Sequence, residues 1–183
     1  MSLSLPRPVV QIRPLTREDF ATILSWFPDE AALVQWGGPE VRFPLDAAQL
    51  ERPLEESTRR PPARLIWVGE LEATVIAHAS VALDWRHGVA RLGRVCIAPT
   101  YRGRGLAVPF LSRIRDSVFG MVAFERLELN VYIFNDAAIW TYKRLGFVEE
   151  GVRRSSVRMG QARWDTAIYG LLRSEWCSRA AGS

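Results

Sequence analysis

The sequence predicts a single α+β domain built on one mixed, mostly antiparallel sheet that is flanked by helices. Three observations lead to this prediction. Strand-like runs follow one another through residues 65–98 with only short turns between them. Two clear helical patterns come later, over residues 106–120 and 135–146. Further strand-like runs precede, separate and follow these helices, an order typical of α+β folds.

The N-terminal region predicts one strand followed by three short helices. Residues 9–13 contain three β-branched side chains and predict the strand. Thr16 is a suitable cap for a helix that ends near Pro28. We expect a second helix over about 29–37 and a third over 46–58, before a loop rich in arginine and proline.

The middle of the chain predicts an antiparallel meander. Residues 65–69, 74–83 and 89–98 are mostly apolar and are separated by short turns. Residues 84–88 (DWRHG) form the clearest hairpin connection. Strands joined by such short connections pair antiparallel.

The first long helix follows a stretch that contains two glycines. Apolar residues recur at helical spacing from Leu106 to Val118. Pro109 removes a backbone amide early in this helix, so we expect the helix to begin near residue 104, which keeps the proline close to the first turn. Apolar and polar residues then alternate over 127–131, which predicts a strand.

The C-terminal elements have clear boundary signals. Asn135 is expected to cap the second long helix, and Gly146 is expected to end it. Residues 147–153 and 162–172 predict a closing hairpin. Residues 180–183 predict a frayed tail.

Length and composition narrow the class of protein. Residues 1–183 suffice for one domain with a sizeable core and are too few for two. No apolar run of about 18 residues is present to span a bilayer, and the N-terminus lacks the apolar segment of a secretion signal. The two cysteines, Cys96 and Cys177, are far apart and suggest neither a disulfide nor a metal site. We therefore expect a cytoplasmic protein without a metal.

Charge is distributed unevenly along the chain. Residues 28–72 hold nine acidic residues against five arginines, so this segment carries −4 and the remainder +8 of a net charge of +4. One part would suit a cationic ligand and the other an anionic one, although a mixed solvated surface is the commoner explanation. Binding to nucleic acid is disfavoured, because the arginines form no stripe interleaved with aromatic residues.

Residues 101–110 (YRGRGLAVPF) predict a site for a phosphorylated ligand. Glycines there let the backbone approach a ligand, the amides of a helix start point outward, and arginines add positive charge. A P-loop is excluded because the only lysine, Lys143, stands outside that motif. The dinucleotide fingerprint is only half matched by Gly103 and Gly105, since residue 108 is valine and the preceding strands form no βαβ unit.

The same stretch resembles the coenzyme A loop of the GNAT superfamily of N-acetyltransferases. The family motif, Arg/Gln-x-x-Gly-x-Gly/Ala, is matched by residues 102–107 (RGRGLA). The second half of the family signature follows at the family's distance, from Asn135 and Ala138 to Tyr142 and Phe147.

The C-terminal part is similar to one branch of that superfamily, the RimJ/RimL-like acetyltransferases of ribosomal proteins and polyamines. The similarity depends on Arg153, Gly160, the pair Trp164-Asp165 and residues 171–176 (LLRSEW). The element order of the superfamily is followed over roughly residues 9–176.

The resemblance implies a GNAT domain that transfers an acetyl group from acetyl-CoA, its co-substrate, to a primary amine by direct attack through a tetrahedral intermediate. Tyr142 takes the place of the tyrosine that protonates the departing thiolate, and it lies seven residues, about two helical turns, beyond Asn135. A backbone amide of residues 95–97 is implied to stabilise the oxyanion. The residues implied to bind the co-substrate are Val95, Cys96, Ile97, Arg102, Gly103, Arg104, Gly105, Leu106, Ala107 and Asn135.

Several of these residues have a simpler structural alternative. Tyr142 would also suit a core aromatic position, and Asn135 would suit a helix cap alone. Arg102 and Arg104 would suit a solvated helix start. Cys96 lies in an apolar run and would suit a buried small hydrophobic residue.

The general base is not identified by the sequence. Many relatives keep a glutamate on the strand before the motif, whereas residues 85–101 contain no carboxylate. Water held by Asn130, Asp84 or His78 is the alternative, and His78 would otherwise be a core histidine. The missing carboxylate leaves open a second function, a non-catalytic sensor that binds coenzyme A, although the retained Tyr142 argues against it.

The acceptor amine, on a small molecule or a peptide, is expected over the N-terminal helices and the closing hairpin. Trp26, Trp36 and Glu40 are available to contact it, although aromatic residues there belong more often to a core. The acidic excess in residues 28–72 favours a cationic amine. No membrane or nucleic-acid partner is expected, and a homodimer is compatible with the sequence.

Overall fold

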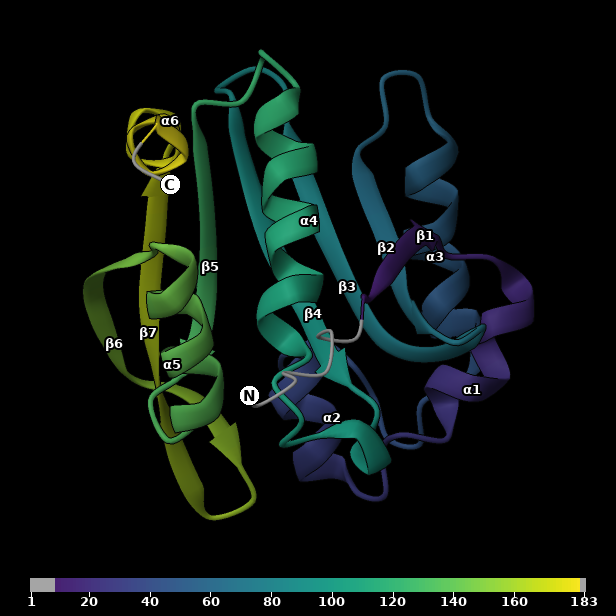
Figure 1. Ribbon diagram of the computed structural model, residues 1–183. Helices are drawn as coiled ribbons and strands as arrows, with labels where there is room; N and C mark the ends of the chain where they lie inside the picture. The colour runs from purple at the N-terminus through teal and green to yellow at the C-terminus, as the bar shows by residue number, and fades with distance from the viewer. Residues whose placement is uncertain (1–8, 182–183) are drawn as a thin grey trace, which may run out of the picture.

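The computed structural model describes residues 9–181 and contains one mixed sheet (Figure 1). Its strands lie in the order β1-β2-β3-β4-β5-β7-β6. Neighbouring strands are antiparallel except β4 and β5, which are parallel. The strands are β1 (Gln11–Pro14), β2 (Arg64–Leu71), β3 (Thr74–Asp84), β4 (Val89–Ile97), β5 (Arg126–Tyr132), β6 (Val148–Met159) and β7 (Ala162–Leu172). The predicted α+β fold with a mostly antiparallel sheet is confirmed.

Helices cover both faces of this sheet. Figure 1 shows α4 and α5 in front of it and α1 to α3 behind it. The helical elements are η1 (Arg17–Asp19), α1 (Phe20–Leu24), α2 (Glu30–Gly37), α3 (Ala47–Thr58), η2 (Pro99–Tyr101), α4 (Ala107–Gly120), α5 (Asp136–Leu145) and α6 (Arg173–Ala181). Within residues 9–181, no helix combines the length and the apolar character that crossing a bilayer requires.

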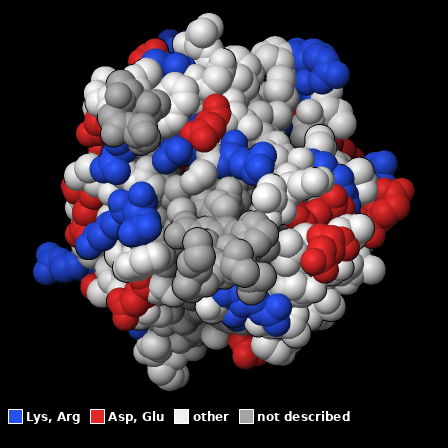
Figure 2. Space-filling view, in the orientation of Figure 1, with Lys and Arg blue, Asp and Glu red and all other residues white. Residues whose placement is uncertain are grey.

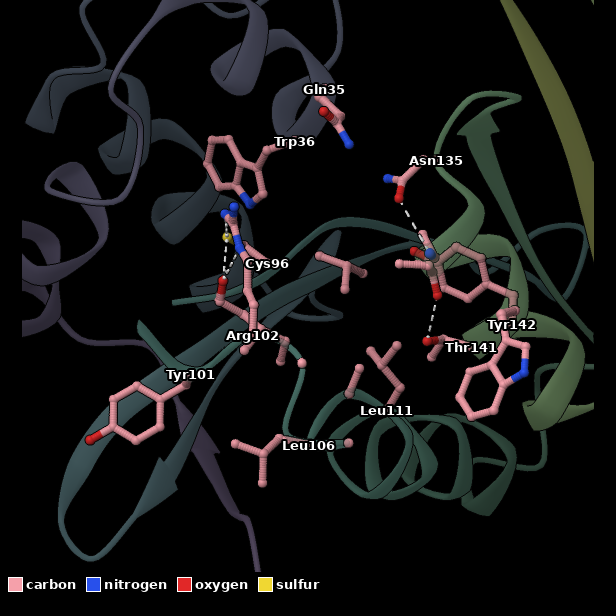
Figure 3. A pocket seen from close by; sticks show the side chains of 18 of the residues that line it. Gln35, Trp36, Cys96, Tyr101, Arg102, Leu106, Leu111, Asn135, Thr141 and Tyr142 are labelled. Atoms are coloured by element: carbon pink, nitrogen blue, oxygen red, sulfur yellow. Dashed lines mark hydrogen bonds between the residues drawn. The ribbon is translucent and has the colours of Figure 1, made fainter. Parts of the chain in front are cut away.

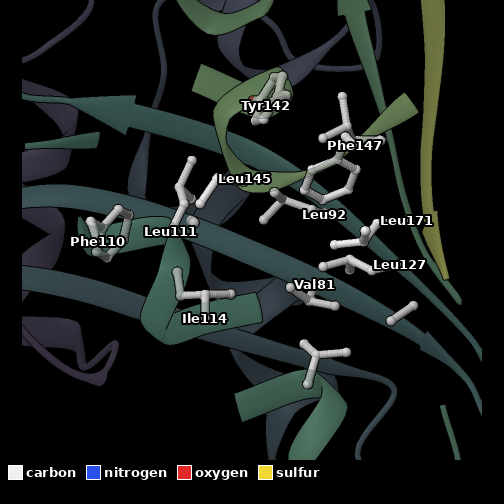
Figure 4. Packing of buried hydrophobic residues seen from close by; sticks show 14 of the residues in the cluster. Val81, Leu92, Phe110, Leu111, Ile114, Leu127, Tyr142, Leu145, Phe147 and Leu171 are labelled. Atoms are coloured by element: carbon white, nitrogen blue, oxygen red, sulfur yellow. The ribbon is translucent and has the colours of Figure 1, made fainter. Parts of the chain in front are cut away.

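Each face of the sheet has its own hydrophobic core. On the α4 side, Phe110 and Ile114 pack with Leu92 of β4 (Figure 4). On the other side, Leu33 of α2 belongs to a second buried cluster that includes Cys96 of β4. The sheet is therefore a central layer whose two faces are both buried, which holds the ends of β4 and β5 in fixed positions.

The start of α4 differs from the prediction. The helix begins at Ala107 and not near residue 104. Pro109 is consequently its third residue, where a backbone amide would have no partner within the helix. The proline is tolerated for this reason, and residues 102–106 stay outside the helix as a loop.

Two C-terminal elements differ from the prediction, because β6 is longer than expected and α6 was not predicted. β6 extends to Met159, past the predicted end at residue 153, because its pairing with β7 resumes at Val157 after an irregularity. Ala180 and Ala181, predicted to lie in a frayed tail, extend α6, as the high helix propensity of alanine allows. Residues 182 and 183 lie outside the described part of the chain.

Candidate active site

The site is built where β4 and β5 separate. Parallel pairing joins residues 89–92 of β4 to residues 126–129 of β5. β4 nevertheless continues to Ile97, and β5 continues to Tyr132. The two strands therefore diverge at their C-terminal ends, and in the described sheet the last part of β4 has no strand partner on the side that faces β5.

A groove of about 600 Å³ occupies this gap (Figure 3). The end of β4, the loop that precedes α4, the first turns of α4 and α5, and residues of α2 line it. Tyr142 and nine of the ten residues expected to bind the co-substrate are among the lining residues, and Arg104 is the exception. The fold thus brings together segments that are distant in the sequence.

The glycine loop owes its shape to two left-handed backbone conformations. Gly103 has a φ of 74° and Gly105 has a φ of 71°. These values favour glycine, because a side chain would be strained there. A Cβ atom at either position would meet no described atom within 4 Å, so the space beside the loop is open. The loop therefore presents bare backbone to the groove at the start of α4.

The two arginines of the loop have different roles. The Nε atom of Arg102 donates a hydrogen bond to the carbonyl oxygen of Ile97 at 3.0 Å, and its side chain lines the groove. The Nη2 atom of Arg104 donates to the carbonyl oxygen of Thr100 at 2.9 Å, and its guanidinium lies 4.9 Å from the ring centroid of Tyr101. Arg104 therefore braces the loop, and only Arg102 faces the groove.

The face of the molecule that includes α4 and α5 carries several basic side chains (Figure 2). In Figure 2, basic side chains predominate over the half of this face that α4 and α5 form. The last turn of α5 adds Lys143 and Arg144. Such a surface suits an anionic ligand.

α5 brings Asn135 and Tyr142 to the groove from one side. The Oδ1 atom of Asn135 accepts a hydrogen bond from the backbone amide of Ala138 at 3.3 Å, so the predicted cap is confirmed. Gly146 ends the helix in a left-handed conformation with a φ of 100°, also as predicted. The side-chain amide nitrogen of Asn135 stays available to a ligand in the groove. Gln35 of α2 points toward the groove from the opposite wall (Figure 3).

Tyr142 belongs to the core and to the groove at the same time. Only 6% of the residue is exposed, and its ring packs edge-on against Phe147 with 5.9 Å between the ring centroids. Its hydroxyl group makes no hydrogen bond within the described part of the chain. Burial raises the pKa of this hydroxyl above its ordinary value. The group therefore remains protonated and is free to donate to a ligand in the groove.

β4 contains a bulge beside the groove. The register with β3 shifts between His78 and Ser80, and Arg94 has a φ of 52°, which is unusual for a residue with a side chain. Residues four apart in a regular strand face the same side of the sheet. Because of the bulge, Leu92 faces the α4 core whereas Cys96 faces the α2 core. Cys96 is buried, and burial raises the pKa of its thiol, which disfavours a nucleophilic role.

None of the three residues considered for holding a catalytic water lines the groove. His78 is buried, its Nδ1 atom lies 2.8 Å from the carbonyl oxygen of Arg94, and burial lowers its pKa to about 4. The Oδ1 atom of Asp84 accepts hydrogen bonds from two amides of the turn between β3 and β4. Asn130 is exposed on β5. Among the described residues that line the groove, none is aspartate, glutamate or histidine.

Several acidic residues of 28–72 have partners within the protein. The side chains of Asp29 and Asp46 cap α2 and α3. Glu51, Glu56 and Glu70 form ion pairs with arginines. Five of the nine acidic side chains are engaged in this way, and none of the nine lines the groove.

The expected acceptor contacts divide between core and groove. Trp36 lines the groove, whereas Trp26 is a buried core residue and Glu40 is an exposed residue outside the lining. Sequence reasoning missed Gln35 and Trp140, which also line the groove. Trp140 is 58% exposed, and an exposed tryptophan on a polar helix face was the signal that could have identified it.

Comparisons with known proteins agree with this geometry. The family model described as "Acetyltransferase (GNAT) family" matches residues 23–147. YokL, an uncharacterized N-acetyltransferase derived from prophage SPbeta of Bacillus subtilis, is 26% identical over 136 residues, which are 74% of this chain and 76% of that protein. The spermidine N(1)-acetyltransferase of Vibrio cholerae is 34% identical over 71 residues, 39% of this chain and 40% of that protein.

A solved structure has the same fold. The spermidine N-acetyltransferase from Vibrio cholerae in complex with CoA and spermine matches with a TM-score of 0.79 at 22% identity, and the match covers 92% of this chain and 98% of that one.

Proposed function

This chain belongs to the GNAT acetyltransferase family, and we propose that the groove between β4 and β5 is where it transfers an acetyl group from acetyl-CoA to a primary amine. The observation that supports this most strongly is the separation of two parallel strands next to a loop that contains two left-handed glycines and leads into a helix start. An extended, amide-containing arm and a pyrophosphate require these two features side by side.

The described residues fit the co-substrate in two places. The open edge of residues 95–97 offers backbone donors and acceptors, so the amides of a pantetheine arm add to β4 as a further strand would. The first amides of α4 point out of the helix, carry its positive end and are approached through the open space beside Gly103 and Gly105. Arg102 adds a charged donor at the same end of the groove.

Chemistry in this groove requires one proton donor and one amine in its neutral form. The amine nitrogen attacks the thioester carbonyl carbon, so a C–N bond forms and the carbonyl oxygen becomes an oxyanion. When the C–S bond breaks, Tyr142 is placed to give its proton to the thiolate, and the nitrogen loses its extra proton to water. Tyr142 recovers its proton from solvent before the next cycle.

The absence of a carboxylate or histidine among the described lining residues affects the choice of acceptor. An amine that arrives protonated finds no base in that lining. At pH 7 about one in ten α-amines is neutral, against about one in 2,500 lysine-like alkylamines. We therefore infer that the α-amines of peptides are preferred over lysine-like alkylamines.

A polyamine is the competing acceptor, because two of the similar proteins are named for spermidine. A panel of amines, assayed for thiol release from acetyl-CoA at pH 7 and pH 9, tests the proposal. Turnover of α-amines at pH 7 supports it. Turnover of spermidine alone contradicts the α-amine preference, and binding of acetyl-CoA without thiol release for any amine identifies a sensor instead. Light scattering tests the homodimer, which stays a prediction.

A further inference from the structure

The bulge in β4 fixes the orientation of one peptide unit beside the groove. The carbonyl oxygen of Arg94 accepts two hydrogen bonds, from the indole Nε1 of Trp36 at 2.7 Å and from Nδ1 of His78 at 2.8 Å. A carbonyl oxygen only accepts, so His78 carries its proton on Nδ1. Both donors are buried, with 7% of Trp36 and 2% of His78 exposed.

The two donors come from different elements and contact each other. Trp36 lies on α2 and His78 on β3, and their ring centroids are 5.4 Å apart. The guanidinium of Arg94 lies 5.5 Å from the centroid of the Trp36 indole ring. Together these contacts hold Arg94 in a left-handed conformation that a residue with a side chain seldom adopts.

The orientation of this carbonyl determines where the next amide points. In a trans peptide, the C=O of one residue and the N–H of the next point in opposite directions. His78 is on β3, which lies on one side of β4, and the groove opens on the other side, toward β5. A carbonyl held toward β3 by His78 therefore directs the N–H of Val95 toward the β5 side of β4, where the groove that Val95 lines opens.

We propose that Trp36 and His78 are positioning residues that hold the Arg94–Val95 peptide unit so that the N–H of Val95 donates to the thioester oxygen of bound acetyl-CoA. The inference rests on the proposed function of the groove. It goes beyond that function because it assigns the alignment of the oxyanion donor to two side chains that do not touch the reacting atoms.

The test removes each side-chain donor while keeping an apolar side chain at the same position. Trp36→Phe removes the indole N–H. The matched control is Trp85→Phe, because the Nε1 of Trp85 makes a hydrogen bond of the same 2.7 Å length to the carbonyl oxygen of Pro62, outside the groove. His78→Leu removes the second donor, and His78→Asn restores an N–H close to the Nδ1 position.

Three measurements distinguish positioning from a general structural role. We expect kcat to fall about tenfold or more in Trp36→Phe and His78→Leu, less than the 10²- to 10³-fold typical of deleting an oxyanion donor outright. The Kd of free CoA is expected to stay within about twofold. The infrared stretch of a ¹³C-labelled thioester carbonyl in bound acetyl-CoA is expected to move back toward its value in solution. His78→Asn and Trp85→Phe should behave like the unaltered protein.

The outcomes separate this inference from the proposed function. If the unaltered protein binds acetyl-CoA but Trp36→Phe and His78→Leu leave both kcat and the carbonyl stretch unchanged, the positioning role is refuted and the function of the groove stands. If the unaltered protein does not bind acetyl-CoA, the proposed function itself is wrong. If thermal unfolding shows that Trp36→Phe does not fold, the pair His78→Leu and His78→Asn decides the question with the same measurements.

Discussion

Replacing Tyr142 with phenylalanine isolates the proposed acid from the packing of the same side chain. Phenylalanine keeps the edge-on contact with Phe147 and the burial of the ring, so only the hydroxyl group is lost. Within the described chain that hydroxyl makes no hydrogen bond, so its removal leaves no buried partner unsatisfied. The free energy of unfolding and the affinity for CoA should therefore change little.

The effect on turnover is expected to be large. A positioned general acid typically contributes 10²- to 10⁴-fold, so we expect kcat to fall by at least about 10²-fold, or about 2.7 kcal/mol in activation free energy. Because burial raises the pKa of the hydroxyl above its ordinary value near 10, the tyrosine should not limit the rate up to about pH 10.

The assay is thiol release from acetyl-CoA with a saturating amine, together with the Kd of CoA and a thermal unfolding curve for the same preparation. Tyr169→Phe is the matched control. The ring of Tyr169 is also fully buried, but its hydroxyl donates to Glu149 at 2.7 Å and does not line the groove. This control should keep its kcat. If Tyr142→Phe retains its kcat as well, Tyr142 is not the acid.

Three further perturbations test other parts of the site. Gly105→Val should weaken acetyl-CoA binding, measured by calorimetry, at least tenfold. The control Gly160→Val strains a similar left-handed glycine in the turn between β6 and β7 and should only lower the melting temperature. Equal affinities of the two variants for acetyl-CoA would contradict the pyrophosphate assignment. Folding lowers the pKa of His78 from 6.5 to about 4, so between these pH values the unfolded chain binds a proton that the folded chain does not. The free energy of unfolding should therefore decline by about 3 kcal/mol as the pH falls from above 6.5 to 4. His78→Asn should flatten this decline in urea unfolding, and an unaltered slope would show that other groups cause it. Trp140→Ala should raise KM for acetyl-CoA, because its exposed indole lines the groove, and an unchanged KM would refute a contact with the co-substrate.

Local signals explain what could be predicted from the sequence. The antiparallel meander follows from short turns, and the boundaries of α5 follow from Asn135 and Gly146, because caps depend on residues next to each other in the chain. Except for Arg104, residues 102–107 line the groove as the family motif implied, and the glycines of that motif set the backbone conformation themselves. Such features are encoded within a few residues of where they occur.

The features that were missed depend on contacts between distant segments. The hydrogen bond between Trp36 and Arg94 joins residues 58 positions apart, and no pattern in either segment indicates it. Arg104 was predicted to bind the co-substrate together with Arg102, because both arginines belong to one loop. In the structure, Arg104 stacks on Tyr101 and does not line the groove. The ion pairs of Glu51 and Glu70 with arginines elsewhere in the sequence likewise could not be assigned before the fold was known.

A crystal structure with bound CoA is the most direct test of where the reaction occurs. We predict the pantetheine arm between β4 and β5, paired with the backbone of residues 95–97, and the pyrophosphate on the amides that follow Gly103. A structure in which β4 and β5 close against each other, or in which CoA occupies another part of the surface, would contradict the assignment of this groove.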